Sequence, residues 1–319
     1  MKHGIKEYRL KVPTWQGGQL FVRQFLPEQP QALVILIHGL GNRGDVFCHQ
    51  GHGLAQYLAD MGFHCLVPDL IGHGQSWPHL SRRLEHSANL IIQEDMPRLL
   101  AEARRQANGL PIFLIGQGFG GVLLASAYAR EPGVRPGVLG MIHLGTRRND
   151  SLGGVRHSPL GRFISRSLLP ALGVVKGAVP MRWLGQGPEP EYLALYRDFL
   201  RWSDGPWVSD DETEFDYSNA ARHLDWPPSL YLARRNGGYT DHVADVREFM
   251  RELGTHNGRL WVLGKRDGNV RNYSAQSLLI HDDARVDHFP VLLDWINERL
   301  MLLPKGVRVR HLVSVDRSS

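Results

Sequence analysis

The chain has 319 residues, of which 42% are hydrophobic and 22% are charged, and its formal net charge is +5. These proportions are ordinary for a soluble globular enzyme and exclude a disordered or fibrous protein. The basic residues are scattered and form no long run or nucleic-acid motif. The positive charge therefore predicts a solvated surface and no nucleic-acid partner.

The N-terminal residues 1–12 lack the apolar core of a signal peptide. No segment has the unbroken apolar length that a membrane span needs. We therefore expect a cytoplasmic protein without a transmembrane segment. Cys48 and Cys65 have no metal-ligand spacing, so we expect two buried thiols, no disulfide and no metal site. Nothing in the sequence calls for a cofactor.

The chain begins with two strand-like runs, 7–12 and 19–26, which predict an antiparallel hairpin. Short runs rich in Val, Ile and Leu follow, and they are typical of strands buried on both faces of a parallel sheet. These runs are 32–39, 64–69, 112–116, 138–145, 230–234 and 260–264. Helical patterns alternate with them at 52–62, 89–109, 120–130, 242–254 and 289–301. The alternation predicts an α/β protein with a doubly wound, mostly parallel sheet.

Residues 149–225 interrupt this alternation, because they lack strand character and contain helical and aromatic-rich stretches. Long excursions of this kind are commonly lids or binding elements. We predict a core formed by 1–148 and 226–303, a helical cap at 149–225 and a basic C-terminal tail at 304–319. A purely structural cap and a lid that covers a ligand are both compatible with the sequence.

The stretch "IFLIGQGFGGVLLASAYA", residues 112–129, passes from an apolar strand through a glycine-rich turn into a helix. A nucleophile elbow is built in this way, with the pattern G-x-S-x-G raising a serine above a sheet. Gly118 occupies the serine position. Glycine adopts the strained backbone of an elbow readily, but it has no atom with which to attack a substrate.

Two more motifs follow buried strands: "IHGLGNRGD" at 37–45 and "PDLIGHGQS" at 68–76. Together with "IGQGFGG" at 115–121, in this order, they make residues 32–300 resemble the α/β-hydrolase fold superfamily of serine esterases and lipases. All three lie where strands end, at the edge where open α/β sheets bind ligands. The resemblance implies an α/β-hydrolase fold, and we interpret residues 72–74, "GHG", as turn architecture.

The resemblance also implies an oxyanion hole, in which the backbone N–H groups of Leu40 and Phe119 form a pair. Backbone donors do not depend on the serine side chain, so this part of the machinery is expected to persist. His38 begins the first of these loops. It either takes a direct part in the chemistry or fixes its own loop by hydrogen bonds. The expected ligand-binding residues are His38, Gly39, Leu40, Gln117, Gly118 and Phe119.

A serine mechanism in this fold needs an acid after the serine and then a histidine. By the resemblance, the acid position after strand 230–234 is Gly237. Asp241 follows, but it is also expected to cap the helix that begins nearby. Asp150, after the strand at 138–145, is a weaker alternative.

Two placements of the histidine compete. In the first, the base position is Ala275 and a nearby acidic position is Ser277, which leaves all three triad members absent. In the second, the base is His288, two residues before Pro290 at the start of the last helix. The sequence favours the first placement, and both stay open.

The favoured hypothesis is a non-hydrolytic protein of this fold that binds a small apolar or carbonyl-bearing molecule, or a protein partner, under its cap. The alternative is an enzyme with serine-independent chemistry, such as a lyase or cyclase, that uses His288 as its base. His38 is a candidate beside His288, and the polar helpers would be Gln117, Asp45 or Asp241. A hydrolase with a displaced nucleophile is the least favoured hypothesis, with Cys48, Ser76 and Ser126 as candidates. The oligomeric state is not predicted.

Overall fold

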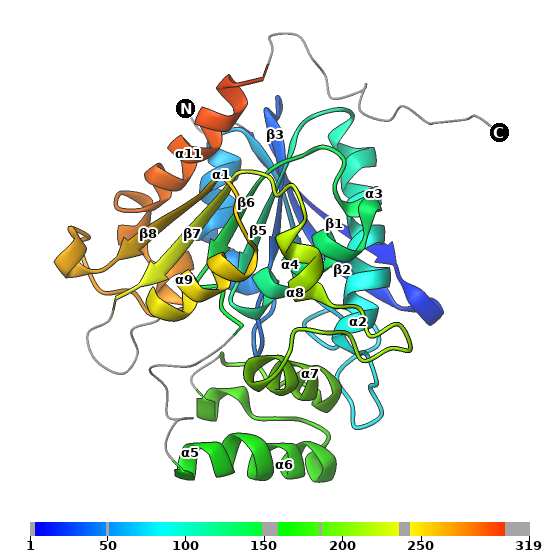
Figure 1. Ribbon diagram of the computed structural model, residues 1–319. Coiled ribbons are helices and arrows are strands. Elements are labelled where there is room, and N and C mark those ends of the chain that lie inside the picture. Colours follow the sequence, from blue (N-terminus) through cyan, green and yellow to red (C-terminus); the bar gives the residue numbers. More distant parts are fainter. Residues whose placement is uncertain (1–3, 49–50, 149–158, 185–186, 236–242, 304–319) are drawn as a thin grey trace.

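The computed structural model describes residues 4–48, 51–148, 159–184, 187–235 and 243–303, and they form one eight-stranded sheet flanked by helices (Figure 1). The strand order is β1-β2-β4-β3-β5-β6-β7-β8. β2 is antiparallel to β1 and to β4, and all other neighbours are parallel. The strands are β1 (Lys6–Pro13), β2 (Gln19–Leu26), β3 (Ala32–Ile37), β4 (Phe63–Pro68), β5 (Ile112–Gln117), β6 (Val138–Leu144), β7 (Ser229–Arg234) and β8 (Gly258–Leu263).

Helices cover both faces of the sheet. One face carries α2 (Ala88–Leu90), α3 (Met96–Ala107), α4 (Phe119–Arg130), α8 (Tyr217–Arg222) and α9 (Val243–Glu252). The other carries α1 (Leu54–Asp60), α10 (Ser277–Ile280) and α11 (Phe289–Met301). A π-helical turn, Ile91–Asp95, joins α2 to α3. No helix in these ranges combines the length and the apolar character that crossing a lipid bilayer requires.

The central strand β3 explains why the two helical layers form. Its side chains alternate between the faces, so Leu33 and Ile35 pack with α3 and α4, whereas Val34 and Leu36 pack with α1 and α11. All six residues of β3 are buried. A strand covered on both sides must be apolar throughout, and this is the pattern that predicted a parallel sheet.

The predictions of fold class, strand positions and N-terminal hairpin are confirmed. Cys48 and Cys65 are free and buried, as expected. The division into core and cap stays a prediction. Residues 149–158 and the predicted tail at 304–319 lie outside the described residues.

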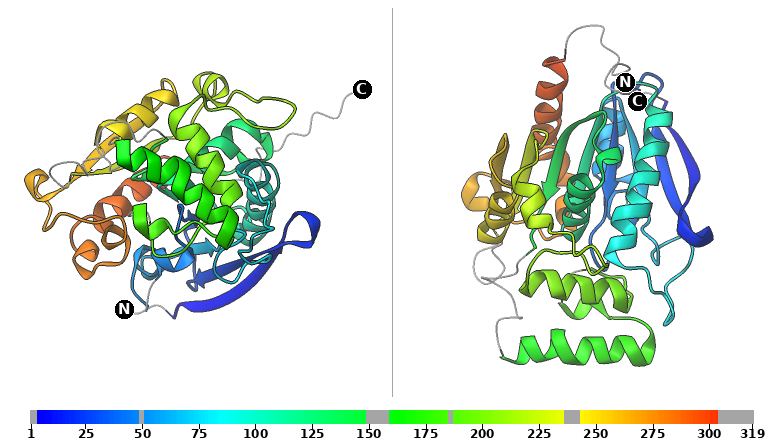
Figure 2. Two further views of the ribbon diagram at one scale, coloured as in Figure 1. Left: turned by 90° about the horizontal axis from the view of Figure 1, so that it is seen from below. Right: turned by 45° about the vertical axis from the view of Figure 1, so that its right-hand side comes forward.

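Within the predicted cap, α5 (Pro159–Phe163), a π-helical turn (Ile164–Leu168) and α6 (Leu169–Lys176) form one outer helical rod. α7 (Leu193–Asp204) lies between this rod and the sheet (Figures 1 and 2). Both elements lie beyond the edge of the sheet where β5 ends.

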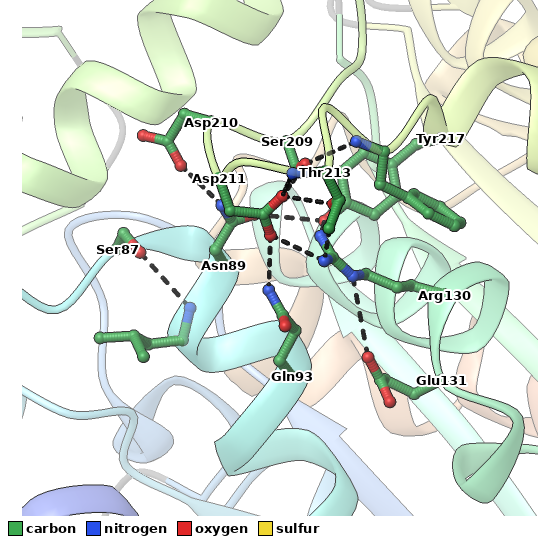
Figure 3. Close-up of polar contacts among 12 residues, drawn as sticks. Ser87, Asn89, Gln93, Arg130, Glu131, Ser209, Asp210, Asp211, Thr213 and Tyr217 are labelled. Atoms are coloured by element: carbon green, nitrogen blue, oxygen red, sulfur yellow. Dashed lines mark hydrogen bonds and ion pairs between the residues drawn. The ribbon is translucent and has the colours of Figure 1, made fainter.

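The loop between α7 and α8 is fastened to the core through Asp211 (Figure 3). Its carboxylate accepts hydrogen bonds from Gln93 Nε2 at 2.9 Å and from Ser209 Oγ at 2.8 Å. It also pairs with Arg130 of α4 at 2.7 Å, and Thr213 donates to it through both its backbone and its hydroxyl. One carboxylate thus joins the loop to α4 and to the turn before α3.

Candidate functional site

Gly118 stands between the end of β5 and the start of α4, with φ 53° and ψ −123°. Its N–H donates to the Leu144 carbonyl at 3.0 Å, and its carbonyl accepts from Gly121 N at 3.1 Å. A positive φ of this size is unfavourable for residues with a side chain and easy for glycine. The expected strand–turn–helix elbow is therefore present, with glycine at its tip.

The glycines of the elbow differ in the structural reason that requires glycine at each position. A Cβ on Gly116 would come within 3.0 Å of Gly121 Cα, and one on Gly120 would come equally close to the His38 carbonyl. Both clashes involve backbone, which does not move aside cheaply. A Cβ on Gly118 would meet nothing within 4 Å. The space into which an elbow side chain projects is therefore open.

The loop after β3 packs directly on this elbow. The Gly39 N–H donates to Oε1 of Gln117 at 2.8 Å. A Cβ on Gly39 would lie 2.7 Å from the Gln117 carbonyl and 3.3 Å from the Phe119 nitrogen, so only glycine allows this approach. Among the described residues, neither Leu40 N–H nor Phe119 N–H has a hydrogen-bond acceptor. Two backbone donors next to the elbow are thus available to a ligand.

Helix α7, which lies within the predicted cap, packs aromatic side chains on Phe119, the first residue of α4. The Phe119 ring lies edge-on to Phe199 with centroids 5.3 Å apart, and it lies 5.8 Å from the Trp202 ring. All three side chains are buried. The residue directly after the elbow position is therefore surrounded by apolar rings on the side of α7.

A comparison with protein families decides the relationship. The profile of the family described as "Serine aminopeptidase, S33" matches residues 28–188, which include both motif loops, the elbow and the outer part of the cap. The chain belongs to this S33 family of α/β hydrolases.

Curated relatives agree with the family assignment. Human monoglyceride lipase is 30% identical over 120 residues, and the rat enzyme is 29% identical over 117 residues. These alignments cover 37% and 36% of this chain and 37% and 36% of the two relatives. The chain thus matches little more than a third of the length of these lipases.

Solved structures resemble the whole fold at low identity. A soluble variant of monoglyceride lipase from Saccharomyces cerevisiae, in complex with a substrate analog, superposes with a TM-score of 0.64 at 15% identity. The superposition covers 94% of this chain and 96% of the yeast protein. A Pyrococcus furiosus esterase gives a TM-score of 0.56 at 13% identity, covering 93% and 91%. At these identities the likeness shows the α/β-hydrolase fold alone.

In this S33-family chain, both ring nitrogens of His38 are hydrogen-bonded, one within its own loop and one to the loop after β4. Nδ1 contacts the Gly39 carbonyl at 3.0 Å, and Nε2 accepts from Leu70 N–H at 3.0 Å. The Leu70 bond assigns the proton to Nδ1, which donates to Gly39. Burial, together with repulsion from His73, lowers the pKa of His38 to about 3. The neutral imidazole satisfies both bonds, which matches the loop-fixing alternative for this residue.

The GHG turn brings a second histidine into a buried ion pair. His73 Nε2 lies 3.1 Å from an oxygen of Glu191, which comes from the cap, and both side chains are buried. The same carboxylate accepts from Gly41 N–H at 3.2 Å and from Tyr192 N–H at 3.1 Å. Burial alone would lower the pKa of His73, but Glu191 and a hydrogen bond to the Ile71 carbonyl outweigh it and raise that pKa.

The expected acid positions, Gly237, Asp241 and Asp150, lie outside the described residues. Of the two base positions, Ala275 is partly exposed in the loop before α10. Ser277, expected beside it, is the first residue of α10 and exchanges hydrogen bonds with Ser274. No described contact joins either residue to Gly118.

His288, the other candidate base, is fully buried at the start of α11. Its Nε2 contacts the Leu278 carbonyl at 2.7 Å, and its ring lies between Tyr273 and Phe289 at centroid distances of 4.6 and 5.0 Å. Nδ1 has no hydrogen-bond partner among the described residues. Burial lowers the pKa of His288, so its ring is held neutral in the core. The helper candidate Asp45 pairs with Arg43 at 2.6 Å.

The three substitute nucleophiles are each engaged elsewhere. Ser76 and Ser126 are fully buried, and their hydroxyls donate to the backbone carbonyls of Asp69 and Val122. Burial raises the pKa of the Cys48 thiol to about 11, so the reactive thiolate is scarce at neutral pH. None of the three lies on an elbow.

Sequence reasoning missed two charged groups near this edge of the sheet. Glu191 carries no motif of its own, and its pairing with His73 appears only when the cap folds. Arg234, the last residue of β7, is buried and donates to the Tyr273 carbonyl at 3.3 Å. Burial and the neighbouring Arg147 lower the pKa of Arg234 to about 10. An arginine three residues before the expected acid position gave no signal in the sequence.

Proposed function

We propose that this protein binds a small apolar, carbonyl-bearing molecule at the elbow without hydrolysing it through a serine. The observation that carries the proposal is Gly118 at the tip of an otherwise complete elbow, with open space where a side chain would project. In serine hydrolases, loss of the nucleophile lowers kcat by about a millionfold, which corresponds to about 8 kcal/mol. Binding does not depend on that atom.

The groups that persist suit a carbonyl oxygen attached to an apolar chain. The N–H groups of Leu40 and Phe119 are the type of donor that holds a carbonyl or carboxylate oxygen. The aromatic rings of Phe199 and Trp202 supply apolar surface beside them. Since the curated relatives are monoglyceride lipases, a monoacylglycerol is the ligand class we propose. A protein partner under the cap and a cytoplasmic location stay predictions.

Catalysis is tested with p-nitrophenyl butyrate, comparing the wild type with Gly118→Ser. We expect no burst and no turnover above background from the wild type. We also expect that the serine variant alone does not reach efficient turnover, because the acid and base positions are expected to be vacant as well. Turnover by the wild type would contradict the proposal. Efficient turnover by Gly118→Ser would instead contradict the expected vacancy of the acid and base positions.

Binding is tested by calorimetric titration with 1-octanoylglycerol. Gly118→Leu fills the open space at the elbow, so we expect it to abolish binding. Gly268→Leu is the matched control, because Gly268 also has a positive φ of 95° and nothing within 4 Å of its added Cβ, but it lies in the loop after β8. Equal binding by the wild type and both variants would place the ligand elsewhere and overturn the proposal.

The alternative of serine-independent chemistry rests on His288. If a reaction is found, His288→Ala decides whether this ring takes part. His288 is packed in the core and bonded to the Leu278 carbonyl, which favours a role in positioning the loop before α11. An unchanged rate in the variant would agree with that role.

A further inference from the structure

Two arginine pairs follow neighbouring strands at the edge of the sheet that carries the elbow. Arg147 and Arg148 lie just beyond the end of β6, whereas Arg234 ends β7 and Arg235 follows it. β6 and β7 are parallel and hydrogen-bonded to each other, so both pairs lie at the same edge. Gly118 belongs to this edge too, because its N–H donates to the carbonyl of the last residue of β6. Open α/β sheets bind their ligands along this edge.

One arginine of each pair is compensated by a carboxylate. Arg148 donates to both oxygens of Glu252, at 3.1 and 2.5 Å, and also to two backbone carbonyls at the end of α7. Arg235 pairs with Asp267 at 3.1 Å. Arg148 and Arg235 thus have the partners that a structural role requires of a charged side chain.

Arg234 is buried as deeply as Arg148 but has no such partner. Among the described residues, its guanidinium donates to the Tyr273 carbonyl at 3.3 Å and pairs with no carboxylate. A guanidinium has five N–H donors, so most of its hydrogen-bonding capacity is unused. Burial and the neighbouring cation of Arg147 lower its pKa only to about 10, so Arg234 is still charged at neutral pH. A buried charge of this kind is unfavourable unless an anion binds to it.

The position of Arg234 allows a second contact to a ligand that lies at the elbow. β7 is two strands away from β5, and neighbouring strands are about 4.8 Å apart, so the two strand ends are separated by about 10 Å. Gly145 lies between them, directly after β6. Among the described residues, a Cβ on Gly145 would meet nothing within 4 Å, as is also true of Gly118. The edge is therefore open at both glycines between the elbow and Arg234.

We propose that Arg234 binds a negatively charged oxyanion of the ligand, a phosphate or a carboxylate, while the carbonyl of that ligand lies at the elbow. Arginine fits this role because its planar guanidinium presents paired N–H donors that match both kinds of oxyanion. The proposal rests on the proposed binding at the elbow and extends it to a ligand class: anionic acyl esters are preferred over neutral ones.

The test is calorimetric titration of the full chain with two matched pairs of ligands. In the phosphate pair, 1-octanoylglycerol 3-phosphate is compared with 1-octanoylglycerol. In the carboxylate pair, octyl hydrogen succinate is compared with octyl methyl succinate. We expect the anion of at least one pair to bind about tenfold more tightly than its neutral partner. The pair with the larger preference identifies the oxyanion.

Three variants assign the preference to one side chain. Arg234→Met should bind the anionic and the neutral ligand equally. Arg234→Lys keeps the charge but not the paired donors, so we expect it to retain a preference of about threefold. Arg235→Met is the matched control, because it removes the adjacent charge, which is partly exposed and already paired with Asp267. It should keep the full preference of the wild type.

Thermal unfolding provides a readout that a purely structural arginine would not give. Arg234→Met removes a buried charge that no described carboxylate compensates, so we expect it to melt no lower than the wild type. The anionic ligand should raise the melting temperature of the wild type more than the neutral ligand does. In Arg234→Met the two ligands should raise it equally.

The outcomes separate this proposal from the proposed function. Equal binding of anionic and neutral ligands by the wild type overturns the anion site and leaves binding at the elbow standing. An undiminished preference in folded Arg234→Met also overturns the anion site. If that variant does not fold, an undiminished preference in Arg234→Lys does so in its place. Binding of none of the four ligands overturns the proposed function and the anion site together.

Discussion

His73 and Glu191 face each other at 3.1 Å in the buried contact between the GHG turn and the cap, although they lie 118 residues apart in the chain. The Glu191 carboxylate also accepts a hydrogen bond from Gly41 N–H, and Gly41 directly follows Leu40 in the loop after β3. A single acidic side chain of the cap therefore fixes both motif loops. Breaking a buried ion pair on one side leaves the other charge uncompensated, which is strongly destabilising.

We expect Glu191→Gln to lower the free energy of unfolding by about 3 kcal/mol at pH 6. Folding raises the pKa of His73, so the stabilisation is complete below the unfolded value near 6.5 and is lost as pH rises through the raised folded value. The difference between wild type and variant should therefore shrink between pH 6 and pH 9. Urea unfolding across this range measures it.

The control for that measurement is Glu189→Gln, which makes the same change of charge two residues away. Glu189 is partly exposed and its contact to Arg43 is 3.4 Å, so we expect little effect at any pH. A constant difference between Glu191→Gln and the wild type from pH 6 to pH 9 would show that the ion pair is not the source.

Alanine substitutions at the elbow glycines should lower the free energy of unfolding by different amounts. Gly118→Ala introduces a positive-φ alanine without a clash, so we expect a loss of about 1 kcal/mol. Gly268→Ala, with the same kind of backbone and the same open space, should lose a similar amount. Gly116→Ala drives a Cβ into the Gly121 backbone and should lose about 3 kcal/mol or fail to fold. Equal losses for Gly116→Ala and Gly118→Ala in chemical denaturation would contradict the open space.

Asp211 should contribute stability that disappears in acid (Figure 3). Burial would raise its pKa, but hydrogen bonds from Thr213, Ser209 and Arg130 outweigh burial and hold the pKa below its usual range. The contribution is present above the unfolded pKa near 3.9 and is lost as pH falls through the lower folded value. We expect Asp211→Asn to cost about 1 to 2 kcal/mol at pH 7 and progressively less below about pH 4.

Asp210→Asn is the neighbouring control for Asp211. Asp210 is half-exposed, accepts one bond from Asn89 at 2.6 Å and lies 3.6 Å from Arg201. Its substitution should change the unfolding free energy much less. If Asp211→Asn and Asp210→Asn lower the free energy of unfolding equally at pH 7, the hydrogen bonds around Asp211 do not contribute extra stability.

The two thiols should be unreactive in the folded protein. Burial raises the pKa of Cys48 to about 11, and it raises the pKa of Cys65 further. At pH 8 we expect Ellman's reagent to label the folded chain many times more slowly than the chain in guanidinium chloride. Cys65→Ser isolates the signal of Cys48. Fast labelling of this variant in buffer would contradict the burial of Cys48.

The sheet could be predicted because its strands are covered on both faces. The uninterrupted apolar runs of β3, β4 and β5 are visible in the sequence as soon as both faces must exclude water. The elbow was equally visible, since its glycine spacing reflects local backbone geometry. Both features depend on neighbouring residues in the chain, and such features can be read from one sequence.

Features that depend on distant residues were not predicted. Nothing near Glu191 indicates that it will pair with His73. Nothing near His288 indicates that its Nε2 will form a hydrogen bond with the Leu278 carbonyl. For His38 the sequence left two roles open, and it gave no sign of the hydrogen bond from Leu70 N–H in the neighbouring loop. Such partners are chosen by tertiary packing, which brings together segments far apart in the chain.

The open space around Gly118 separates its identity from the architecture of the protein. Gly116 and Gly120 are imposed by backbone contacts, so replacing either one requires compensating changes elsewhere. Residue 118 has no such neighbours among the described residues, and the elbow keeps its shape whichever small residue stands there. Apart from the modest cost of a positive φ for a residue with a side chain, selection at this position can therefore follow chemistry. A substitution of glycine by serine at position 118, or of serine by glycine, requires no compensating change in the rest of the elbow. The step is therefore reversible in evolution.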